Sequence, residues 1–466
     1  MRVQNKVEAR STPHGRPPPP IIRPLELTIE KLVYGGDGLA RLAPDEQGRR
    51  KTVFVPLVLP GERVDAEIVE DRPAFARAQL KQVLDSAPFR ILPLCPYFAR
   101  CGGCHYQQAS YEDQLRLKGE ILRETLARIA KLEVGELATH ASPAWNYRNR
   151  TRLHVRNGAG KFEIGYHRLG SHALEPVREC PISSPLINRA LAQIWKIGEA
   201  EGFPEALVAV ELFATNDDTG LLVQGQVDRR AMFSPARFKP MAEGLRTAIP
   251  ELRGVVAGHA SIDAGEATAA PELSASSAAG KPLAVFGEDA LPFTTASGEY
   301  RVSAGSFFQT NRFLTDTVVE LVTRDRAGKF ALDLYAGVGL FSLPLARQFE
   351  RVVAVESAPR SAADLKHNAP PHVQALEAAT EHYLERGSKP PDYVVVDPPR
   401  AGLGRRVAER LGKLFSPQLT YVSCDPSTLA RDLPVLLQSG YRIQEAHLVD
   451  LFPQTFHIES VFRLAR

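Results

Sequence analysis

The sequence lacks several features that would assign a protein to a class at once. No apolar run approaches the roughly 18 residues that a membrane-spanning helix needs, and the N-terminal MRVQNKVEAR has no apolar stretch typical of a secretion signal. Cysteine is scarce, with five in 466 residues. Without a secretion signal, these thiols are better explained by metal binding or catalysis than by a disulfide framework. We therefore expect a cytoplasmic, monomeric protein that does not bind a membrane.

The sequence also has little net charge, +3 from 57 basic and 54 acidic residues. Residues 1–160 nevertheless carry +7, so residues 161–466 carry −4. A basic first part is expected of a protein that contacts a polyanion, and a solvated charged surface is the alternative. The hydrophobic share of 44% and the charged share of 24% are those of a globular protein, and the length suggests roughly two to four domains.

The first part of the chain suggests a tail followed by a small β module. Residues 1–21 are polar and contain a proline run, which is typical of a disordered tail. Residues 22–84 contain five short strand-like stretches, and the glycines at 35, 36 and 38 indicate a turn. This pattern predicts a β-barrel of the oligonucleotide-binding (OB) kind, with another small β module as the alternative.

Residues 85–300 are predicted to form a central α/β domain. Within it, residues 111–130 have the apolar spacing of an amphipathic helix, which we expect to pack on the domain that follows. Residues 257–280 are rich in alanine, serine and glycine and contain almost no large apolar residues. Their composition predicts a flexible insertion.

Residues 301–466 form the last predicted domain, where strands and helices alternate. Its strands are KFALDLY, RVVAVE, HVQALE, DYVVVD and LTYVSC, followed by two strands with no helix between them. Such alternation predicts a mostly parallel sheet covered by helices, with ligands beyond the C-terminal ends of the strands. The whole chain is thus predicted to be a multi-domain α+β protein.

A glycine-rich turn follows the first strand of this domain. Gly337 and Gly339 lie in DLYAGVGLF, and Glu356 ends the second strand, where a carboxylate can bind both hydroxyls of a ribose. Two glycines fall short of the dinucleotide fingerprint, and there is no P-loop lysine. An adenosine ligand without a pyrophosphate fits this pattern, and S-adenosylmethionine is the obvious one. The alternative is a turn that merely packs a helix on a strand.

The fourth strand ends in Asp397-Pro398-Pro399-Arg400. The prolines fix the loop, so that Asp397 could hydrogen-bond a planar edge such as the imide of a base. Amino-group methyltransferases have an aromatic residue after the Asp-Pro-Pro of this loop. Arg400 stands at that place, which argues against that alternative.

The fifth strand ends at Cys424, followed by Asp425 and a helix. Asp425 is predicted to cap this helix, and a thiol at a helix N-terminus is expected to have a lowered pKa and to act as a nucleophile. A buried structural cysteine is the alternative. The matching base is expected to be Glu459 or His457, both in the final strand region.

These groups together fit one reaction. The C5 carbon of uracil is a poor nucleophile, but thiolate attack at C6 turns C5 into an enolate carbon that can accept a methyl group from a sulfonium. A base then removes the C5 proton and the thiolate leaves. Cys424, the turn at Gly337 with Glu356, Asp397 and Glu459 would supply the thiolate, the donor site, the base-holding group and the general base.

Four cysteines form a second group: Cys95, Cys101, Cys104 and Cys180. Four thiolates suit either a tetrahedral zinc ion or a [4Fe–4S] cluster. Further on, YRNRTRLHVR alternates basic residues. A strand would place them on one face, where RNA phosphates are the natural partner. The RNA-binding residues predicted in this way are Arg148, Arg150, Arg152 and Arg156.

The motifs GSFFQTN, DLYAGVGLF, VVDPPRAG, YVSCDPSTLARD and LFPQTFHIES resemble, in order, those of the RNA (uracil-5-)methyltransferases. The chain is most similar to the 23S rRNA type, which has an N-terminal TRAM domain that binds RNA, a central iron–sulfur domain and a class I (Rossmann-like) methyltransferase domain. The resemblance runs from about residue 22 to the C-terminus and selects the [4Fe–4S] cluster over zinc.

The resemblance also implies roles for individual residues. Cys424 would be the nucleophile and Glu459 the base. The residues implied to line the methyl-donor and uracil sites are Gln309, Tyr335, Gly337, Gly339, Leu340, Glu356 and Asp397. Several members of the family carry asparagine where Leu340 stands.

The resulting prediction is an enzyme that methylates uridine C5 in RNA through a covalent cysteine adduct, with rRNA as the expected substrate and tRNA as the alternative. Cytosine-5 methylation is a second possibility, but RNA enzymes of that kind generally use two cysteines and this domain has one. A third is an RNA-binding iron–sulfur protein without methyltransferase activity, which would not bind S-adenosylmethionine.

Overall fold

The structure is a computed structural model that describes residues 24–158, 161–260, 281–387 and 389–466. The described chain separates into two compact units. One contains residues 24–32 and 37–88, and the other contains residues 33–36 and 89–466. The tail predicted at residues 1–21 lies outside the described residues.

The first unit is a six-stranded sheet with the order β1-β5-β6-β4-β3-β2. Its strands are β1 (Pro24–Thr28), β2 (Lys31–Leu32), β3 (Asp37–Arg41), β4 (Thr52–Pro56), β5 (Arg63–Asp71) and β6 (Phe75–Asp85). Alternate residues such as Val53 and Val55 point into an apolar core. Gly38 is needed there because a Cβ would lie 2.3 Å from Val58. The predicted small β module is therefore present.

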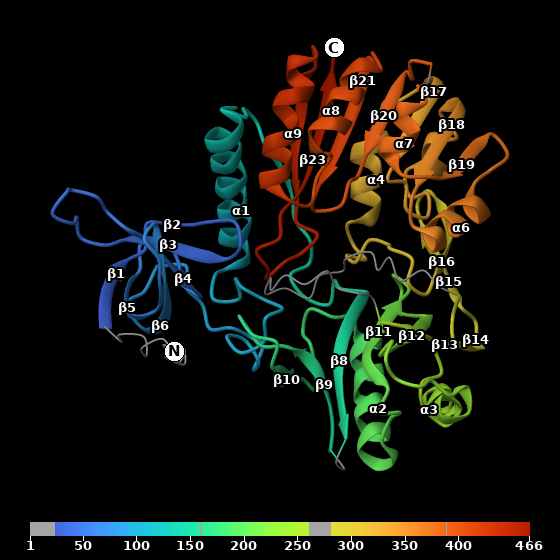
Figure 1. Ribbon diagram of the computed structural model, residues 1–466, viewed down its shortest axis with the longest axis horizontal. Helices are drawn as coiled ribbons and strands as arrows, with labels where there is room; N and C mark the ends of the chain where they lie inside the picture. Colours follow the sequence, from blue (N-terminus) through green and yellow to red (C-terminus); the bar gives the residue numbers. More distant parts are fainter. Residues whose placement is uncertain (1–23, 159–160, 261–280, 388) are drawn as a thin grey trace, which may run out of the picture. The chain divides into compact units, whose positions relative to one another are not determined.

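The second unit contains a seven-stranded sheet with the order β10-β9-β8-β11-β12-β13-β14. Its strands are β8 (Arg150–Gly158), β9 (Lys161–His167), β10 (Leu174–Pro176), β11 (Leu207–Ala214), β12 (Leu221–Val227), β13 (Leu252–His259) and β14 (Ala284–Gly287). Helix α2 (Pro185–Glu201) packs on β9 and β11, and α3 (Pro235–Ala248) packs on β13 and β14 (Figure 1).

The predicted start of the insertion at residues 257–280 is wrong, because residue 257 still belongs to a strand. Residues 257–259 complete strand β13, and Ala257 is fully buried between β12 and β14. Ala257 packs in the apolar core of this sheet, so its small side chain does not mark a linker. Residues 261–280 lie outside the described part of the chain.

The predicted helix at residues 111–130 is confirmed as α1 (Tyr111–Thr125) followed by the π-helical turn η1 (Leu126–Ala130). It packs on α9 (Pro426–Gln438), as expected. Lys118 is fully buried, and its ammonium lies 2.6 Å from the carboxylate of Asp450. This ion pair fixes α1 to the loop that leads into the last strand.

A second sheet of eight strands fills the rest of this unit, with the order β19-β18-β17-β20-β21-β23-β22-β7. Its strands are β17 (Gly328–Leu334), β18 (Phe349–Glu356), β19 (Val373–Glu377), β20 (Tyr393–Val396), β21 (Gln418–Ser423), β22 (Arg442–Val449), β23 (Glu459–Ala465) and β7 (Ala138–His140). The runs of valine in β18 and β20 are buried throughout, as central parallel strands require. The edge strand β7 was not predicted from the sequence.

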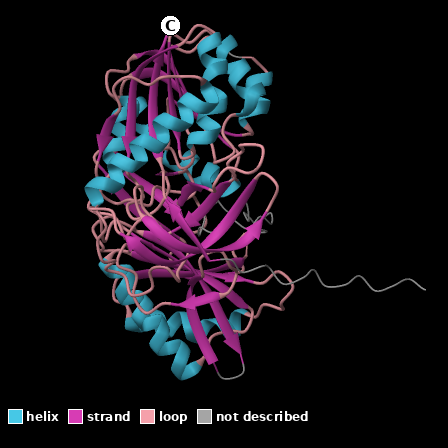
Figure 2. Ribbon diagram, turned by 90° about the vertical axis from the view of Figure 1, so that its left-hand side faces the viewer, coloured by secondary structure: helices cyan, strands magenta, loops and turns pink. Residues whose placement is uncertain are grey.

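Helices cover this sheet in two layers, and Figure 2 shows helices beside the strands. α7 (Thr380–Glu385), α8 (Gly404–Lys413) and α9 lie side by side (Figure 1). The other layer contains α4 (Thr315–Thr323), α5 (Ser342–Leu345) and α6 (Pro359–Asn368), which contact β23 and β18. A hairpin of β15 (Ala290–Thr295) and β16 (Gly298–Ser303) leads into this region.

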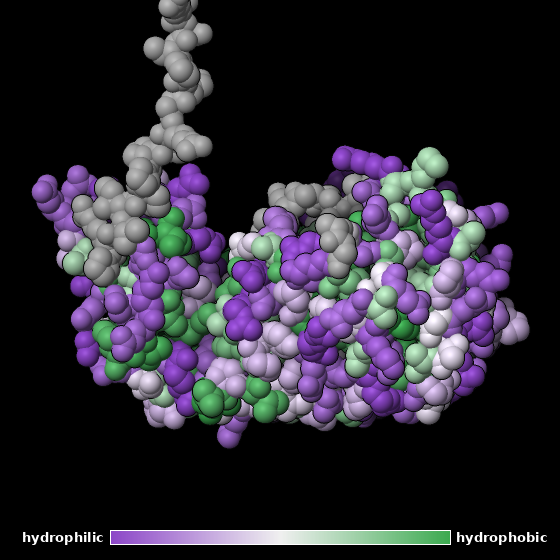
Figure 3. All heavy atoms as spheres, turned by 90° about the horizontal axis from the view of Figure 1, so that it is seen from below, coloured by the Kyte–Doolittle hydropathy of each residue, from purple (hydrophilic) through white to green (hydrophobic). Residues whose placement is uncertain are grey.

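The surface drawn in Figure 3 is mostly hydrophilic, with hydrophobic side chains in small groups. Among the described helices, we find none that combines the length and the apolar character needed to span a bilayer.

Candidate active site

The predicted site residues meet at one edge of the eight-stranded sheet. Glu356 ends β18, Asp397 follows β20, and Cys424 follows β21. Glu459 reaches the same edge because β23 runs antiparallel to β21, so that its first residues pair with the end of β21. The fold therefore brings together groups that lie up to 103 positions apart in the sequence.

The turn after β17 has the conformation that a close ligand needs. Gly337 and Gly339 have φ angles of +57° and +98°, which favour glycine. A Cβ at Gly337 would meet nothing within 4 Å, whereas one at Gly339 would lie 2.9 Å from Leu365. The Gly337 amide donates to Glu356 Oε2 at 2.9 Å. The turn thus leaves open space beside Gly337 and holds Glu356 against it.

Carboxylates gather beside this turn. Burial, together with the carboxylates of Asp333 and Glu356, raises the pKa of Asp397 to about 7. The pKa of Asp333 also rises to about 7, because it is buried and lies near Glu356. One oxygen of Asp333 is buried without a partner in the described structure. A positively charged ligand would relieve the repulsion among these carboxylates, as the sulfonium and ammonium groups of S-adenosylmethionine would.

Cys424 lies directly before α9. Asp425 caps that helix as predicted, accepting from the amides of Ser427 and Thr428 at 2.8 and 2.9 Å. The predicted lowering of the thiol pKa is wrong. Burial raises the pKa of Cys424, and the carboxylates of Glu459 and Asp397 raise it further. These effects outweigh the helix N-terminus, so the thiol is protonated at neutral pH.

The structure separates the two candidate bases. Burial raises the pKa of Glu459 well above its usual value, and Asp397 adds to this effect. His457 lies before β23 and accepts a hydrogen bond from Arg400 at 3.0 Å. Burial and the Arg400 charge lower the pKa of His457, so its ring is neutral. The surroundings of Glu459 therefore favour proton uptake, whereas those of His457 oppose it.

The remaining residues predicted at the donor and uracil sites differ in placement. Tyr335 has a positive φ angle of 62° and follows β17, and burial raises its pKa to about 12. Gln309 is 7% exposed and precedes Thr310, whose carbonyl accepts from Asn149. The side chain of Leu340 packs in the apolar core and is 7% exposed, and its place at the methyl-donor site stays a prediction. An asparagine there could reach a polar partner, but a leucine cannot.

Three residues near Cys424 were not predicted as site residues. The Tyr34 hydroxyl donates to the carbonyl of Cys424 at 3.2 Å, and its ring meets Phe456 edge-on at 5.6 Å. Arg400 lies close enough for its positive charge to lower the pKa of the Cys424 thiol, which opposes the rise that burial causes. A charged residue after the two prolines was the available sequence signal for Arg400. Nothing local marks Tyr34, which is distant in sequence.

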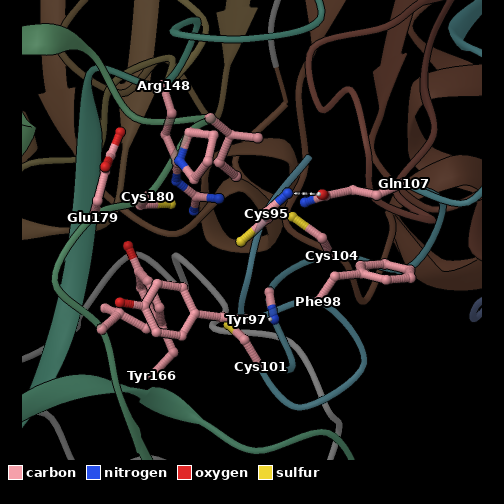
Figure 4. Close-up of a pocket in the computed structure, with 14 residues that line it drawn as sticks. Cys95, Tyr97, Phe98, Cys101, Cys104, Gln107, Arg148, Tyr166, Glu179 and Cys180 are labelled. Atoms are coloured by element: carbon pink, nitrogen blue, oxygen red, sulfur yellow. Dashed lines mark hydrogen bonds between the residues drawn. The ribbon is translucent and has the colours of Figure 1, made fainter. Parts of the chain in front are cut away.

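The other four cysteines surround one cavity, which is shown in Figure 4. Burial, together with the nearby thiols of Cys180 and Cys95, raises the pKa of Cys101 to about 12, so these groups are neighbours. Among the described residues, no three are close enough together to hold a single metal ion. An opening lined by four cysteines suits a cluster, which spaces its ligands more widely than one ion does. The residues present therefore fit an iron–sulfur cluster.

The predicted basic face is only partly present. Arg148 and Arg150 are 7% and 4% exposed, and Arg150 pairs with Glu211 at 2.5 Å. Arg150 is buried because it begins β8, which lies inside the central sheet between β9 and β11. Arg148 precedes β8 and forms isolated bridges with Ser183 and Asn311. Arg152 is half-buried, and Arg156 is exposed and forms an ion pair with Glu163. The prediction that Arg148 and Arg150 face RNA is corrected accordingly.

Comparison with known proteins identifies the family. Residues 285–381 and 387–466 match the tRNA (Uracil-5-)-methyltransferase family, and residues 23–81 match the TRAM domain. An uncharacterized RNA methyltransferase of Aquifex aeolicus is 32% identical over 94% of this chain and 98% of its own length. One of Streptomyces avermitilis is 31% identical over 94% of this chain and 96% of its own length.

A solved structure supports the fold. The tRNA (uracil-54, C5)-methyltransferase of Pyrococcus abyssi, in complex with S-adenosyl-L-homocysteine, has a TM-score of 0.70 at 24% identity, covering 95% of this chain and 100% of that one. The first unit is thus a TRAM half-barrel and the eight-stranded sheet a class I methyltransferase fold. The chain belongs to the RNA (uracil-5-)methyltransferases, which transfer a methyl group from S-adenosylmethionine to uracil C5 in RNA.

Proposed function

We propose that the protein forms 5-methyluridine in 23S rRNA through a covalent bond between Cys424 and uracil C6. The observation that carries the covalent route is the meeting of Cys424, Asp397 and Glu459 at one edge of the sheet, with carboxylates close enough to raise the pKa of the thiol. Only a flipped-out base could reach this edge. The target uridine would therefore lie in a loop or an opened helix.

Each residue would act at a stated bond. The Cys424 thiolate adds to C6, and the electrons of the C5–C6 double bond move to C5 and O4. Asp397 would hold the imide edge of the ring. C5 would accept the electrophilic methyl group that S-adenosylmethionine supplies, as the methyl–sulfur bond breaks and S-adenosylhomocysteine leaves. The Glu459 carboxylate then removes the C5 proton, and the electron pair left behind restores the double bond as the C6–sulfur bond breaks.

Glu356 would hold the methyl donor. Replacing it with alanine removes the group that accepts from the amides of Gly337 and Ala358, together with the expected acceptor for ribose hydroxyls. We expect S-adenosylhomocysteine to bind about 10–100-fold more weakly, corresponding to the loss of one or two charge-assisted hydrogen bonds. Calorimetry measures this directly. Glu377 ends the neighbouring strand β19, and Glu377→Ala is the matched control; unchanged affinity in Glu356→Ala would contradict the assignment.

The reaction should speed up as the pH rises. Because the pKa of the Cys424 thiol is raised, the thiolate fraction at neutral pH is small and increases up to about tenfold per pH unit. The pKa of Asp397 near 7 adds to the same trend, since its carboxylate favours a cationic donor. The rate of covalent-adduct formation in a single turnover, measured at a saturating donor concentration, reports the titration of the Cys424 thiol without the effect of Asp397 on donor binding. A rate independent of pH between about 6 and 9 would contradict the raised thiol pKa.

The RNA substrate is tested by product analysis. The resemblance of the motif set to the 23S rRNA type supports rRNA as the substrate, and the match to the tRNA (Uracil-5-)-methyltransferase family keeps tRNA as the alternative. A strain lacking the protein should lose 5-methyluridine from rRNA, with tRNA unchanged. Loss from tRNA alone would overturn the rRNA assignment and keep the reaction, whereas 5-methylcytidine would overturn the reaction.

We further propose that Cys95, Cys101, Cys104 and Cys180 hold a [4Fe–4S] cluster. The support is the single cavity that all four line. Protein purified without oxygen should contain iron and sulfide in equal amounts, and replacement of Cys104 with serine should lower both. Zinc in place of iron would overturn this part of the proposal.

A further inference from the structure

Arg148 is a buried cation that faces the cysteine cavity. It is 7% exposed and lines the cavity together with all four cysteines. In Figure 4 its guanidinium points into the cavity, near the side chains of Cys180 and Cys95. Arg148 belongs to none of the β-strands; it forms isolated bridges with Ser183 and Asn311.

This guanidinium has no acidic partner among the residues that the structure describes. Its Nε donates to the carbonyl of Arg150 at 2.9 Å, and in the described part of the chain no carboxylate lies within ion-pair distance of it. The contrast with Arg150 is direct, because that side chain pairs with Glu211. Glu179 also lines the cavity, but it is exposed and forms no ion pair with Arg148 in the described structure. A buried positive charge requires a buried negative one.

We infer that Arg148 is the counter-cation of the iron–sulfur centre and links that centre to the loop that carries Gln309. The inference rests on the cluster proposed above. Four thiolates around a [4Fe–4S] core carry net negative charge, which supplies the partner that Arg148 lacks. Attraction between the two holds both the cluster and the Arg148 main chain in place.

The main chain around Arg148 connects the cysteine cavity to the loop that carries Gln309. Its amide donates to Ile182 at 2.9 Å, and its carbonyl accepts from Ser184 at 2.8 Å, both just past Cys180. On the other side, the Asn149 amide donates to the carbonyl of Thr310 at 3.0 Å. One short segment therefore joins the cysteine cavity to the residue after Gln309. Arg148 would act as a positioning residue through this main-chain segment, without itself contacting the uracil or the methyl donor.

The test compares Arg148→Gln, Arg148→Lys and the matched control Arg156→Gln, which changes an exposed arginine of the adjoining strand. All are purified without oxygen. The readouts are iron and sulfide per chain, the rate of cluster loss to an iron chelator, and the midpoint potential. We expect Arg148→Gln to lose the cluster faster and to show a lower potential, because a nearby positive charge favours the reduced form. In these three cluster readouts, Arg148→Lys and Arg156→Gln should stay close to the unmodified protein.

A second readout follows the link. Arg148→Gln should raise the KM for RNA and weaken the binding of S-adenosylhomocysteine, because Gln309 is expected at the methyl-donor and uracil sites. Equal cluster stability and potential in Arg148→Gln and the unmodified protein would overturn the inference. So would equal loss in Arg148→Lys and Arg148→Gln, which would show that shape, not charge, matters.

These outcomes are separable from failure of the proposed function. If the unmodified protein methylates RNA but contains no iron or sulfide, the cluster proposal and this inference both fail and the methyltransferase stands. If the unmodified protein holds a cluster that Arg148→Gln leaves intact, only this inference fails.

Discussion

Replacing Cys424 with alanine should lower uracil methylation by roughly 10⁴-fold or more, the scale on which loss of a covalent nucleophile lowers turnover. It should also abolish any covalent complex with RNA. The reason is that neither Asp397 nor Glu459 can add to C6 and make C5 nucleophilic. Turnover is measured with labelled methyl donor, and the complex is measured by denaturing electrophoresis with an RNA oligonucleotide.

A partner variant separates the two halves of the reaction. Glu459→Gln keeps the thiol but removes the proton acceptor, so methylated RNA should remain bound to Cys424 and the covalent complex should accumulate. Both variants should bind S-adenosylhomocysteine normally, which shows that the domain is folded. Appreciable turnover in Cys424→Ala would exclude the covalent route, and a complex that fails to accumulate in Glu459→Gln would remove Glu459 as the base.

Replacing Lys118 with alanine should destabilise the second unit by about 3–5 kcal/mol, because it leaves the carboxylate of Asp450 buried without its cation. Both side chains are fully buried, and the Lys118 ammonium also donates to the carbonyl of Phe452 at 2.9 Å. The two tryptophans, Trp145 and Trp195, lie in this unit. Their fluorescence during urea unfolding therefore measures the change.

Two further variants make this result specific. Arg116 lies on the same helix but is exposed, so its ion pairs with Asp113 and Glu120 should matter by no more than about 1 kcal/mol. The double variant Lys118→Met with Asp450→Leu removes both charges and should recover much of the lost stability. A loss in Lys118→Ala no larger than that in Arg116→Ala would contradict the importance of the buried pair.

The alternation of strands and helices along the last domain could be predicted because the sequence signals for each strand are local. Valine-rich runs such as those in β18 and β20 are typical of buried parallel strands, and the groups with chemical roles follow them directly. Strand β7 was missed because three residues carry no periodicity, and its pairing with β22 is a long-range contact. The early residues of the predicted insertion were misassigned because alanine and glycine in a buried strand have the composition of a linker.

Electrostatics was the less predictable part of the site. The position of Cys424 before a helix suggests a lowered thiol pKa, but the opposing burial and the nearness of Glu459 and Asp397 appear only in three dimensions. Likewise, the alternation of arginines from Arg148 onward predicts an exposed basic face of a strand. The sequence around Arg150 does not reveal Glu211, its partner on the neighbouring strand.

The position of β23 has a consequence for synthesis of the protein. This strand pairs with both β21 and β22 and lies between them, although it is the last of the three to leave the ribosome. A nascent chain that stops before residue 459 would expose two unsatisfied strand edges and would lack a proton acceptor. Such fragments would be prone to aggregate, and they would be unable to release an RNA that they had captured.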